Sequence, residues 1–328
     1  MVKAVLLFIV GLLLLIKGGD WFVDGATGIA RKFHVPNILI GATVVAIGTT
    51  LPEVMVSATS AVQGFGDMAY GNAIGSIICN TALVAALTVA IKPSGVPRDS
   101  LIKPVVFFFV AAIIYTGIAF AMGNFTRFTG IMLLVIFVVY MVVLILQAKK
   151  EMKAAKEEED DTNKQEEKPL WYDILFLVIG AALITVGANL LVDNGTFIAT
   201  ALGVPQTVIA LTFVALGTSL PELVTAITSL AKGQGDLSLG NVIGANLFNL
   251  VLVSGVSISL APFKIPSEKI APFSVFGTNN AALVIDVPVM LTVMILLTIP
   301  TLIVGKLRRW QGIVLLCIYA GYCVFQFV

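Results

Sequence analysis

Apolar residues fill long runs of the chain, and short polar segments separate these runs. Most runs reach roughly 20 residues, the length of α-helix that crosses the hydrocarbon core of a bilayer. The pattern predicts ten membrane-spanning helices at residues 3–30, 36–62, 69–91, 102–122, 128–148, 170–200, 205–231, 238–261, 287–304 and 311–327. The first and sixth are long for a single crossing, so we expect them to be tilted. The expected fold class is all-α, a polytopic membrane protein.

Residues 149–169 break this apolar pattern near the middle of the chain. The segment is highly charged and has no hydrophobic period, which is typical of a solvated linker. Its acidic run lacks the spaced ligands and the turn glycine of a Ca²⁺-binding EF-hand loop, and the segment is too short to form a folded domain. It separates a first unit at 1–148 from a second unit at 170–328.

The two units are repeats of one another. Glu222 follows Glu53 by 169 residues, and the same spacing relates Asp193 to Asp24. Near the end of each unit the spacing grows to 182, so the second unit has 13 extra residues, which fall in the irregular stretch 262–288. Five helices in each unit mean that the second unit enters the membrane in the opposite orientation. The sequence therefore predicts two inverted-topology five-helix repeats, an architecture of alternating-access secondary transporters.

Composition and charge support a membrane protein and indicate its orientation. Hydrophobic residues make up 58% of the chain and charged residues 12%, and the net charge of +1 leaves no footprint for nucleic-acid binding. With both termini outside, 15 Lys and Arg residues fall in inside segments and four in outside segments. This bias predicts a multi-pass protein of the cell membrane whose linker, residues 149–169, is cytoplasmic. The first residues lead straight into a span, so we expect no cleavable signal peptide.

Two carboxylates interrupt the apolar pattern at corresponding places. The segments AIGTTLPE at 46–53 and ALGTSLPE at 215–222 agree at six of eight positions and end in Glu53 and Glu222. A carboxylate near the middle of a span costs about 2.5–3.5 kcal/mol to insert, which favours a functional site over a hydrogen bond to a neighbouring helix.

Other oxygen atoms accompany these carboxylates. Pro52 and Pro221 have no amide hydrogen, so the carbonyls of Gly48 and Gly217 lose their helical partners. We expect a kinked or broken helix that exposes backbone oxygens at mid-membrane. Hydroxyl groups lie beside each glutamate, on Thr49, Thr50, Thr218 and Ser219. Carboxylate, hydroxyl and carbonyl oxygens are the ligands of hard cations such as Ca²⁺ and Na⁺.

A second pair of motifs lies in the predicted third and eighth helices, GNAIGSIICN at 71–80 and GNVIGANLFN at 240–249. Polar residues spaced by four share one helix face, namely Asn72, Ser76 and Asn80 in the first copy and Asn241 and Asn249 in the second. For Asn72 and Asn241, near the helix starts, we expect hydrogen bonds between helices. For Asn80 and Asn249, deep in the spans, we expect contact with an ion. The glycines of each motif predict close helix packing, at Gly71 and Gly75 and at Gly240 and Gly244.

The paired motifs GT[ST]LPE and GNx[IV]G[SA]xxxN resemble the two α-repeats of the sodium/calcium exchanger family, and especially its archaeal members without a regulatory domain. The resemblance covers essentially the whole chain. It implies a core made by the second, third, seventh and eighth helices, against which the first and sixth slide to switch access. It also implies that Glu53 and Glu222 bind Ca²⁺ and Na⁺ in alternation. The further ligands that it implies are the side chains of Thr49, Thr50, Thr218, Ser219, Ser76 and Asn80 and the carbonyls of Ala46 and Ala215.

Two positions depart from the pattern of this family. Members often have an acid where Asn249 stands and a serine where Ala245 stands. Asn249 keeps an oxygen and remains a candidate ligand, but it leaves only two acids at the centre. Ala245 removes a hydroxyl from the part of the site that the family uses for Na⁺. The sequence therefore leaves the number of Na⁺ per Ca²⁺ open.

The hypothesis that follows is a secondary active antiporter, not an enzyme, that exchanges Na⁺ for Ca²⁺ through one mid-membrane site. Exchange of Ca²⁺ for H⁺ on the same scaffold is the alternative, and the hydroxyls beside Glu53 and Glu222 favour Na⁺. Inverted repeats with broken helices disfavour a channel, and the lack of an evident serine–base or aspartate pair disfavours an enzyme. We expect no cofactor and no obligatory protein partner; the partners are the transported ions and the bilayer.

The remaining residues with distinctive chemistry are assigned to packing or local structure. Cys79, Cys317 and Cys323 do not indicate a disulfide framework, and Cys79 is expected to pack in its span. His34, the only histidine, lies in a basic segment between helices and is not expected to relay protons. Asp286 precedes Pro288 and is expected to start a helix.

Overall fold

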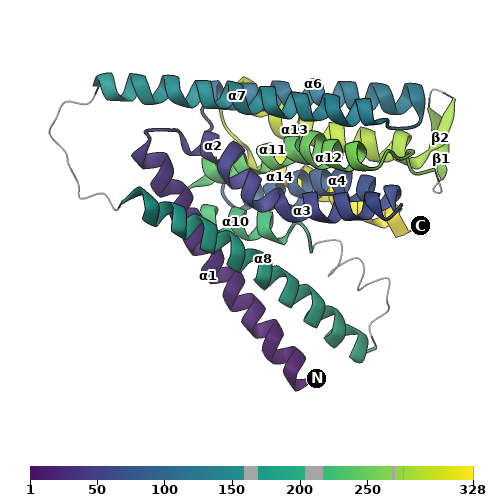
Figure 1. Cartoon of the computed structure of the whole chain (residues 1–328), viewed down its shortest axis with the longest axis horizontal. Coiled ribbons are helices and arrows are strands. Elements are labelled where there is room, and N and C mark those ends of the chain that lie inside the picture. The colour runs from purple at the N-terminus through teal and green to yellow at the C-terminus, as the bar shows by residue number, and fades with distance from the viewer. Residues whose placement is uncertain (159–168, 204–216, 268–269, 276, 328) are drawn as a thin grey trace.

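The computed structural model describes residues 1–158, 169–203, 217–267, 270–275 and 277–327, and nearly all of its regular structure is helical (Figure 1). The helices of the first unit are α1 (Val2–Lys32), α2 (Asn37–Ile40), α3 (Ala46–Val62), α4 (Gly66–Cys79), α5 (Ala86–Ile91), α6 (Arg98–Met122) and α7 (Arg127–Glu158). Those of the second are α8 (Leu170–Ala201), α10 (Leu220–Ala231), α11 (Gly235–Phe248), α12 (Ser254–Leu260), α13 (Val287–Val304) and α14 (Arg309–Phe327).

Within the described residues, eight helical segments are long and apolar enough to cross a membrane, and they confirm eight of the ten predicted spans. They are Val2–Lys32, Asn37–Val62, Gly66–Ile91, Arg98–Met122, Arg127–Glu151, Leu170–Ala201, Gly235–Leu260 and Ala282–Val304. The predicted span at 205–231 lies partly outside the described residues, and its second half is the shorter apolar helix α10. The predicted span at 311–327 is also helical, as α14.

Several helices continue through π-helical turns, which the sequence did not predict. The π-helical segments are Gly41–Val45, Asn80–Ala85, Asn249–Val253 and Ala282–Asp286. The first three join α-helices, so that α2 continues into α3, α4 into α5 and α11 into α12. The fourth, Ala282–Asp286, directly precedes α13. Turns of this type occur frequently at functional sites.

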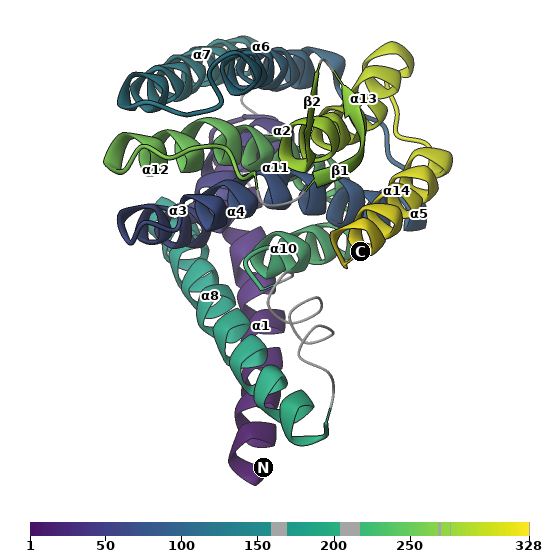
Figure 2. The ribbon, with the colours of Figure 1, turned by 90° about the vertical axis from the view of Figure 1, so that its right-hand side faces the viewer.

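The long helices α1 and α8 cross each other as a pair and extend away from the remaining bundle (Figure 2). Glycines let their backbones approach closely: a side chain on Gly11 would meet the backbone at Gly187, and one on Gly18 would meet the backbone at Gly180. The repeat relates these two contacts to each other, because Gly180 follows Gly11 by 169 residues and Gly187 follows Gly18 by the same spacing.

The two ends of the bundle are named here by what they carry. In Figure 1 the end of α7 and the start of α8 lie on the left, and we call this the linker face. The start of α1 and the end of α14 lie on the right, and we call this the terminal face. Residues 149–158 of the predicted linker are helical as the end of α7, and 159–168 lie outside the described residues.

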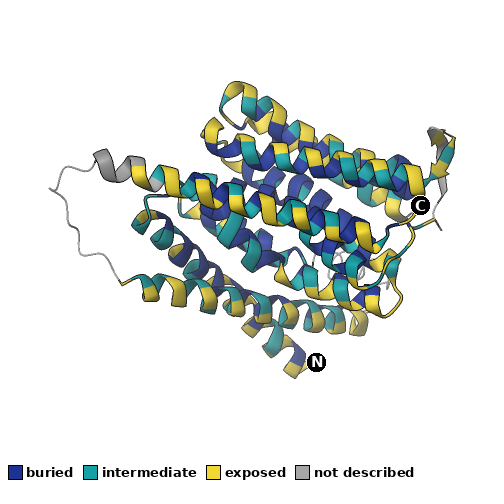
Figure 3. Cartoon of the chain, turned by 45° about the horizontal axis from the view of Figure 1, so that its top comes forward, coloured by how far each residue is buried: buried dark blue, intermediate teal, exposed yellow. Residues whose placement is uncertain are grey.

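Buried residues lie where the helices face one another, and exposed residues face outward (Figure 3). Many of the exposed residues are large and apolar. Among these eight spans, Gly66–Ile91 and Gly235–Leu260 are the most enclosed, with 72% and 83% of their apolar windows buried. By contrast, outward-facing residues such as Ile113 and Phe128 are 69% and 76% exposed. An apolar exterior around a well-buried interior is the pattern of a protein embedded in a bilayer.

The irregular stretch between α12 and α13 contains structure that the all-α expectation missed. Strands β1 (Ile270–Val275) and β2 (Thr278–Asn280) form an antiparallel hairpin at the terminal face. Asp286 directly precedes α13, as expected, but the π-helical turn Ala282–Asp286 leads into that helix, and the Asp286 side chain makes no capping hydrogen bond. Its carboxylate instead accepts hydrogen bonds from the Tyr322 hydroxyl at 3.0 Å and from Gln326 Nε2 at 3.1 Å, which join α13 to α14.

Candidate cation site

Two carboxylates meet in the interior of the bundle, one from α3 and one from α10. Glu53 and Glu222 are both 0% exposed, and they lie near enough for their charges to act on one another. Within the described ranges, none of their four carboxylate oxygens has a hydrogen-bond partner. Two buried carboxylates without partners carry a large desolvation penalty, which a bound cation or a proton offsets.

The other polar residues predicted from the sequence are also buried. Thr49, Thr50, Ser76, Asn80, Ser219 and Asn249 are each at most 4% exposed, and Thr218 is half-buried. The elements that carry them contact one another, since α3 packs against α4 and α11, and α10 packs against α11 and the segment Asn80–Ala85. Ala46 is fully buried at the start of α3, and Ala215 lies outside the described residues.

Direct contacts connect these helices around the carboxylates. The Thr49 hydroxyl lies beside Glu222 and donates a hydrogen bond to Asn241 Oδ1 at 3.2 Å, linking α3 to α10 and α11. The Cys79 thiol lies beside Ser219, which links the end of α4 to the start of α10. The structure therefore brings the two copies of the GT[ST]LPE motif together with both copies of the second motif.

The amides of Asn80 and Asn249 have the same local structure in the two repeats. Each residue is the first of a π-helical segment, each is 0% exposed, and the side-chain atoms of both have no hydrogen-bond partner among the described residues. A buried amide without partners is costly, so its oxygen is free to serve as a ligand. Nothing in the local sequence indicates the π-helical turns; only the repeat relates the two residues.

The hydrogen bonds predicted for the other two asparagines are confirmed. Asn72 Nδ2 on α4 donates to the Glu53 carbonyl at 3.2 Å and to Ser57 Oγ at 2.7 Å on α3. Asn241 on α11 accepts from Thr49, as described above. These side chains hold α4 and α11 against α3 and fix the backbone that carries Glu53.

A kinked or broken helix was expected at Gly48 and Pro52, and in the first copy the helix is not broken. Helix α3 continues from Ala46 through Pro52 to Val62, and the irregular turn lies earlier, at Gly41–Val45. A proline inside a helix removes one hydrogen bond, which the surrounding membrane helices tolerate. In the second copy residues 217–219 form a turn and α10 starts at Leu220, with Pro221 in its first turn, where no amide hydrogen is needed.

The predicted close packing of the motif glycines is confirmed for Gly240 and Gly244. A side chain on Gly240 would meet the backbone of Ile38, and one on Gly244 would meet the backbone of Ala42. The repeat relates Ile38 and Ala42 to residues 207 and 211, which lie outside the described residues, so the packing predicted for Gly71 and Gly75 stays a prediction. Helix α11 lies in the most enclosed of the eight spans, and Ala245 is 0% exposed one turn before Asn249.

Comparison with known proteins covers both repeats. The family model described as sodium/calcium exchanger protein matches residues 3–146 and 172–328, which leaves out the linker. The chain is 37% identical over 327 residues to the putative antiporter CaxA of Alkalimonas amylolytica, with 98% of each protein covered. It is 30% identical over 355 residues to the sodium/calcium exchanger MaX1 of Methanosarcina acetivorans, again with 98% of each covered.

The fold is similar to that of a solved exchanger. A structure of the sodium-calcium exchanger NCX_Mj, soaked with Na⁺ and Sr²⁺, superimposes with a TM-score of 0.79 at 32% identity, and 97% of each chain is covered. The similarity extends over nearly the whole chain, and it confirms the family resemblance that the motifs indicated.

Proposed function

The chain belongs to the sodium/calcium exchanger family, whose members are membrane transporters and not enzymes, and we propose that it exchanges Na⁺ for Ca²⁺ by alternating access. The observation that carries this proposal is the pair of fully buried carboxylates, Glu53 and Glu222, whose oxygens have no hydrogen-bond partners in the described part of the chain. Their joint charge of −2 is neutralised by one Ca²⁺. The names of the exchangers MaX1 and NCX_Mj support Na⁺ as the counter-ion.

The surrounding oxygens suffice for a Ca²⁺ site. Ca²⁺ takes about 6–8 oxygen ligands at roughly 2.3–2.6 Å. Glu53 and Glu222 supply up to four, and the amide oxygens of Asn80 and Asn249 add two. The carbonyls of Ala46 and Ala215 are the proposed remaining ligands. The buried amides without partners support this assignment.

Na⁺ would use the same carboxylates together with the hydroxyl groups. Thr49, Thr50, Ser76, Thr218 and Ser219 supply these oxygens from α3, α4 and the start of α10. Because Ca²⁺ and Na⁺ would share Glu53 and Glu222, they would compete for the site. An ion shifts the access equilibrium only through a difference in its affinity for the two states, so this competition would couple the two fluxes.

The proposed location is the cell membrane, with the linker face in the cytoplasm and both termini outside. The excess of Lys and Arg in the segments of the linker face supports this orientation.

Competition between the two cations can be tested by ⁴⁵Ca²⁺ binding to the purified protein in detergent at constant pH and ionic strength. We expect Na⁺ to displace bound Ca²⁺, and choline at the same concentration to leave it bound. Equal displacement by Na⁺ and choline would contradict a shared site for Na⁺ and Ca²⁺.

Exchange of Ca²⁺ for H⁺ is the second candidate, and a specific observation favours it. Ala245 offers no hydroxyl on the face of α11 that leads to Asn249, and Asn249 itself carries no charge, so the site has fewer ligands for Na⁺. Glu53 and Glu222 would then carry protons in place of Na⁺. Displacement of Ca²⁺ by acidification, without displacement by Na⁺, would support this candidate.

Restoring the missing hydroxyl tests how Na⁺ is bound. In Ala245→Ser, one added oxygen on the inner face of α11 is expected to lower the Na⁺ concentration for half-displacement of Ca²⁺ by about fivefold, since one polar contact contributes about 1 kcal/mol. Ala245→Cys is the matched control, because its thiol has a similar size but is a poor ligand for Na⁺. The same Na⁺ dependence in the serine and cysteine variants would show that residue 245 does not contribute to Na⁺ binding.

A further inference from the structure

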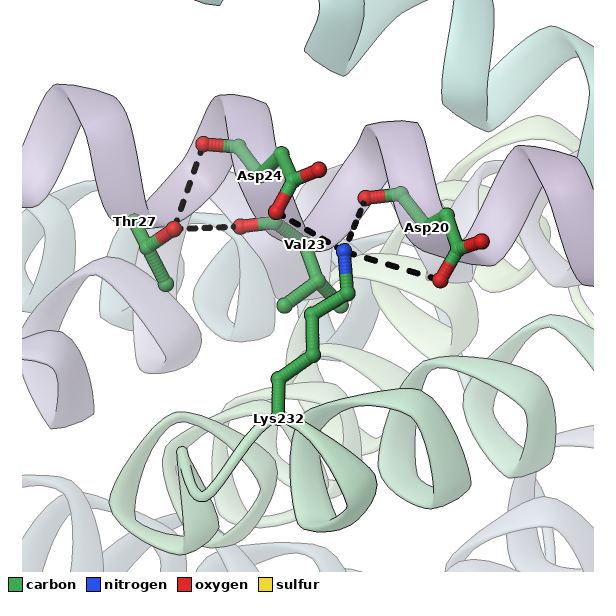
Figure 4. Close-up of polar contacts among 5 residues, drawn as sticks. All are labelled: Asp20, Val23, Asp24, Thr27 and Lys232. Carbon is green, nitrogen blue, oxygen red and sulfur yellow. Dashed lines mark hydrogen bonds and ion pairs between the residues drawn. The ribbon is translucent and has the colours of Figure 1, made fainter.

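A lysine at the linker face connects the core of the bundle to the crossed helix pair (Figure 4). Lys232, directly after α10, donates hydrogen bonds from Nζ to the Asp20 carbonyl at 2.9 Å and to Asp24 Oδ1 at 2.8 Å. Its Nζ also lies 3.5 Å from Asp20 Oδ1. The Lys232 side chain is 27% exposed, and those of Asp20 and Asp24 are 44% and 56% exposed. The ammonium group thus joins α10 to two acids on α1.

Close packing accompanies these ion pairs. Gly19 of α1 lies directly against α10, because an added Cβ there would be 2.7 Å from Thr228 Oγ1 and 2.8 Å from Val224 Cγ1. Helices α1 and α10 therefore meet without a gap on the side of the bundle that leads to the linker face. The hydrogen bonds of Lys232 lie at the end of this contact.

The repeat relates this contact to a second one, between α8 and α3, toward the terminal face. The spacing of 169 residues relates Lys232 to Gln63, Asp20 to Asn189, and Asp24 to Asp193. These three counterparts are exposed, and in the described part of the chain their side chains form no hydrogen bond or ion pair with one another.

The packing also differs between the two related contacts. Met55 occupies the position in α3 that Val224 occupies in α10, and it is 66% exposed. Between α3 and α8 lies a cavity of about 860 Å³, whose lining includes Gly48, Met55 and Asn189. The structure is therefore closed between α1 and α10 and open between α8 and α3.

We propose that Lys232 is a latch that holds α1 against α10 and biases the protein toward the state with a closed linker face. This inference rests on the proposed alternating access. When the crossed pair moves against the core, the two related contacts exchange their open and closed geometries. The ion pairs of Lys232 exist in only one of the two states. Gln63, which has no charge, forms no equivalent ion pair with Asp193 in the other state.

The latch gives the two faces unequal ion affinities. A ligand that needs a minor state binds with an apparent affinity reduced by the population of that state. With the linker face closed in most molecules, ions therefore bind more readily from the terminal face. An exposed ion pair changes a two-state ratio by about 2- to 5-fold.

The latch can be tested by measuring a distance across the open contact by electron–electron double resonance. Spin labels are placed at the exposed positions Val62 of α3 and Phe197 of α8, in reconstituted full-length protein whose three cysteines are replaced by alanine. In Lys232→Gln without Ca²⁺ and Na⁺, more molecules should have the α3–α8 contact closed. We therefore expect the ratio of the shorter-distance population to the longer-distance population to rise about 2- to 5-fold. Lys232→Arg, which keeps the charge, is expected to leave the ratio unchanged.

A charge introduced at the related position provides an independent arm of this experiment. Gln63→Lys is expected to raise the shorter-distance population by pairing with Asp193, and Gln63→Lys with Asp193→Asn is expected to abolish that rise.

An unchanged ratio in folded Lys232→Gln protein, or the same change in Lys232→Arg, would overturn the latch. Since the distance is measured without transport, a failure of the latch is distinguishable from a failure of Na⁺/Ca²⁺ exchange, which only ion binding and flux report.

Discussion

Replacing Glu53 or Glu222 with glutamine is expected to abolish Ca²⁺ transport while leaving the protein folded. Glutamine keeps the shape of the side chain but removes one of the two charges that would neutralise Ca²⁺. Loss of one partner of a buried ion pair typically costs about 3–5 kcal/mol, which lowers affinity by more than about 100-fold. The fold should persist, because each replacement also removes a desolvated charge from the interior.

The measurement is exchange of external ⁴⁵Ca²⁺ for internal Ca²⁺ in proteoliposomes. This exchange needs no Na⁺, so it measures the binding and movement of Ca²⁺ separately from the choice of counter-ion. Gel filtration and thermal unfolding of the same preparations confirm the fold. Asp67→Asn is the matched control, since Asp67 is exposed in the first turn of α4. Robust Ca²⁺ exchange in both glutamine variants would remove Glu53 and Glu222 from the site.

Replacing Gly240 with leucine is expected to prevent stable folding. The leucine side chain would overlap the backbone of Ile38. Because α11 lies in the most enclosed of the eight spans, neither α11 nor the helix that contains Ile38 can move away. Overpacking of a core typically lowers the free energy of unfolding by about 1–3 kcal/mol, and by more where the added side chain overlaps backbone atoms. We expect a large loss of monodisperse protein in detergent and a lower unfolding temperature.

Gly117 of α6 supplies the control for this variant. It is exposed, and within the described residues no atom lies within 4 Å of a Cβ added there. Gly117→Leu is therefore expected to fold like the unmodified chain. Similar yields and unfolding temperatures for the two leucine variants would contradict the close packing of α11 against Ile38.

The spans, the repeat and the central acids could be predicted because each depends on local polarity. Long apolar runs predict membrane helices, and a carboxylate inside such a run is conspicuous, so Glu53 and Glu222 are identified by position alone. Their repeated context predicts that they meet, as they do between α3 and α10. Asn80 and Asn249 follow from the same reasoning, being polar, deep in their spans and related by the repeat.

Features that depend on packing between helices could not be predicted. The motif around Gly240 predicts that another backbone lies close to it, but the sequence does not identify Ile38 and Ala42 as the residues that do so. The π-helical turns at Asn80 and Asn249 have no local signature. Asp286 resembles a helix-start residue in sequence, but its partner Tyr322 comes from a helix that the sequence does not place beside it.

The most direct test of Na⁺/Ca²⁺ exchange is ⁴⁵Ca²⁺ uptake into proteoliposomes loaded with Na⁺, compared with Na⁺-free proteoliposomes at equal pH inside and out. We expect uptake that requires internal Na⁺ and that is lost in Glu53→Gln. Uptake that is indifferent to Na⁺ but driven by an imposed pH gradient would contradict Na⁺/Ca²⁺ exchange and assign the protein to exchange of Ca²⁺ for H⁺.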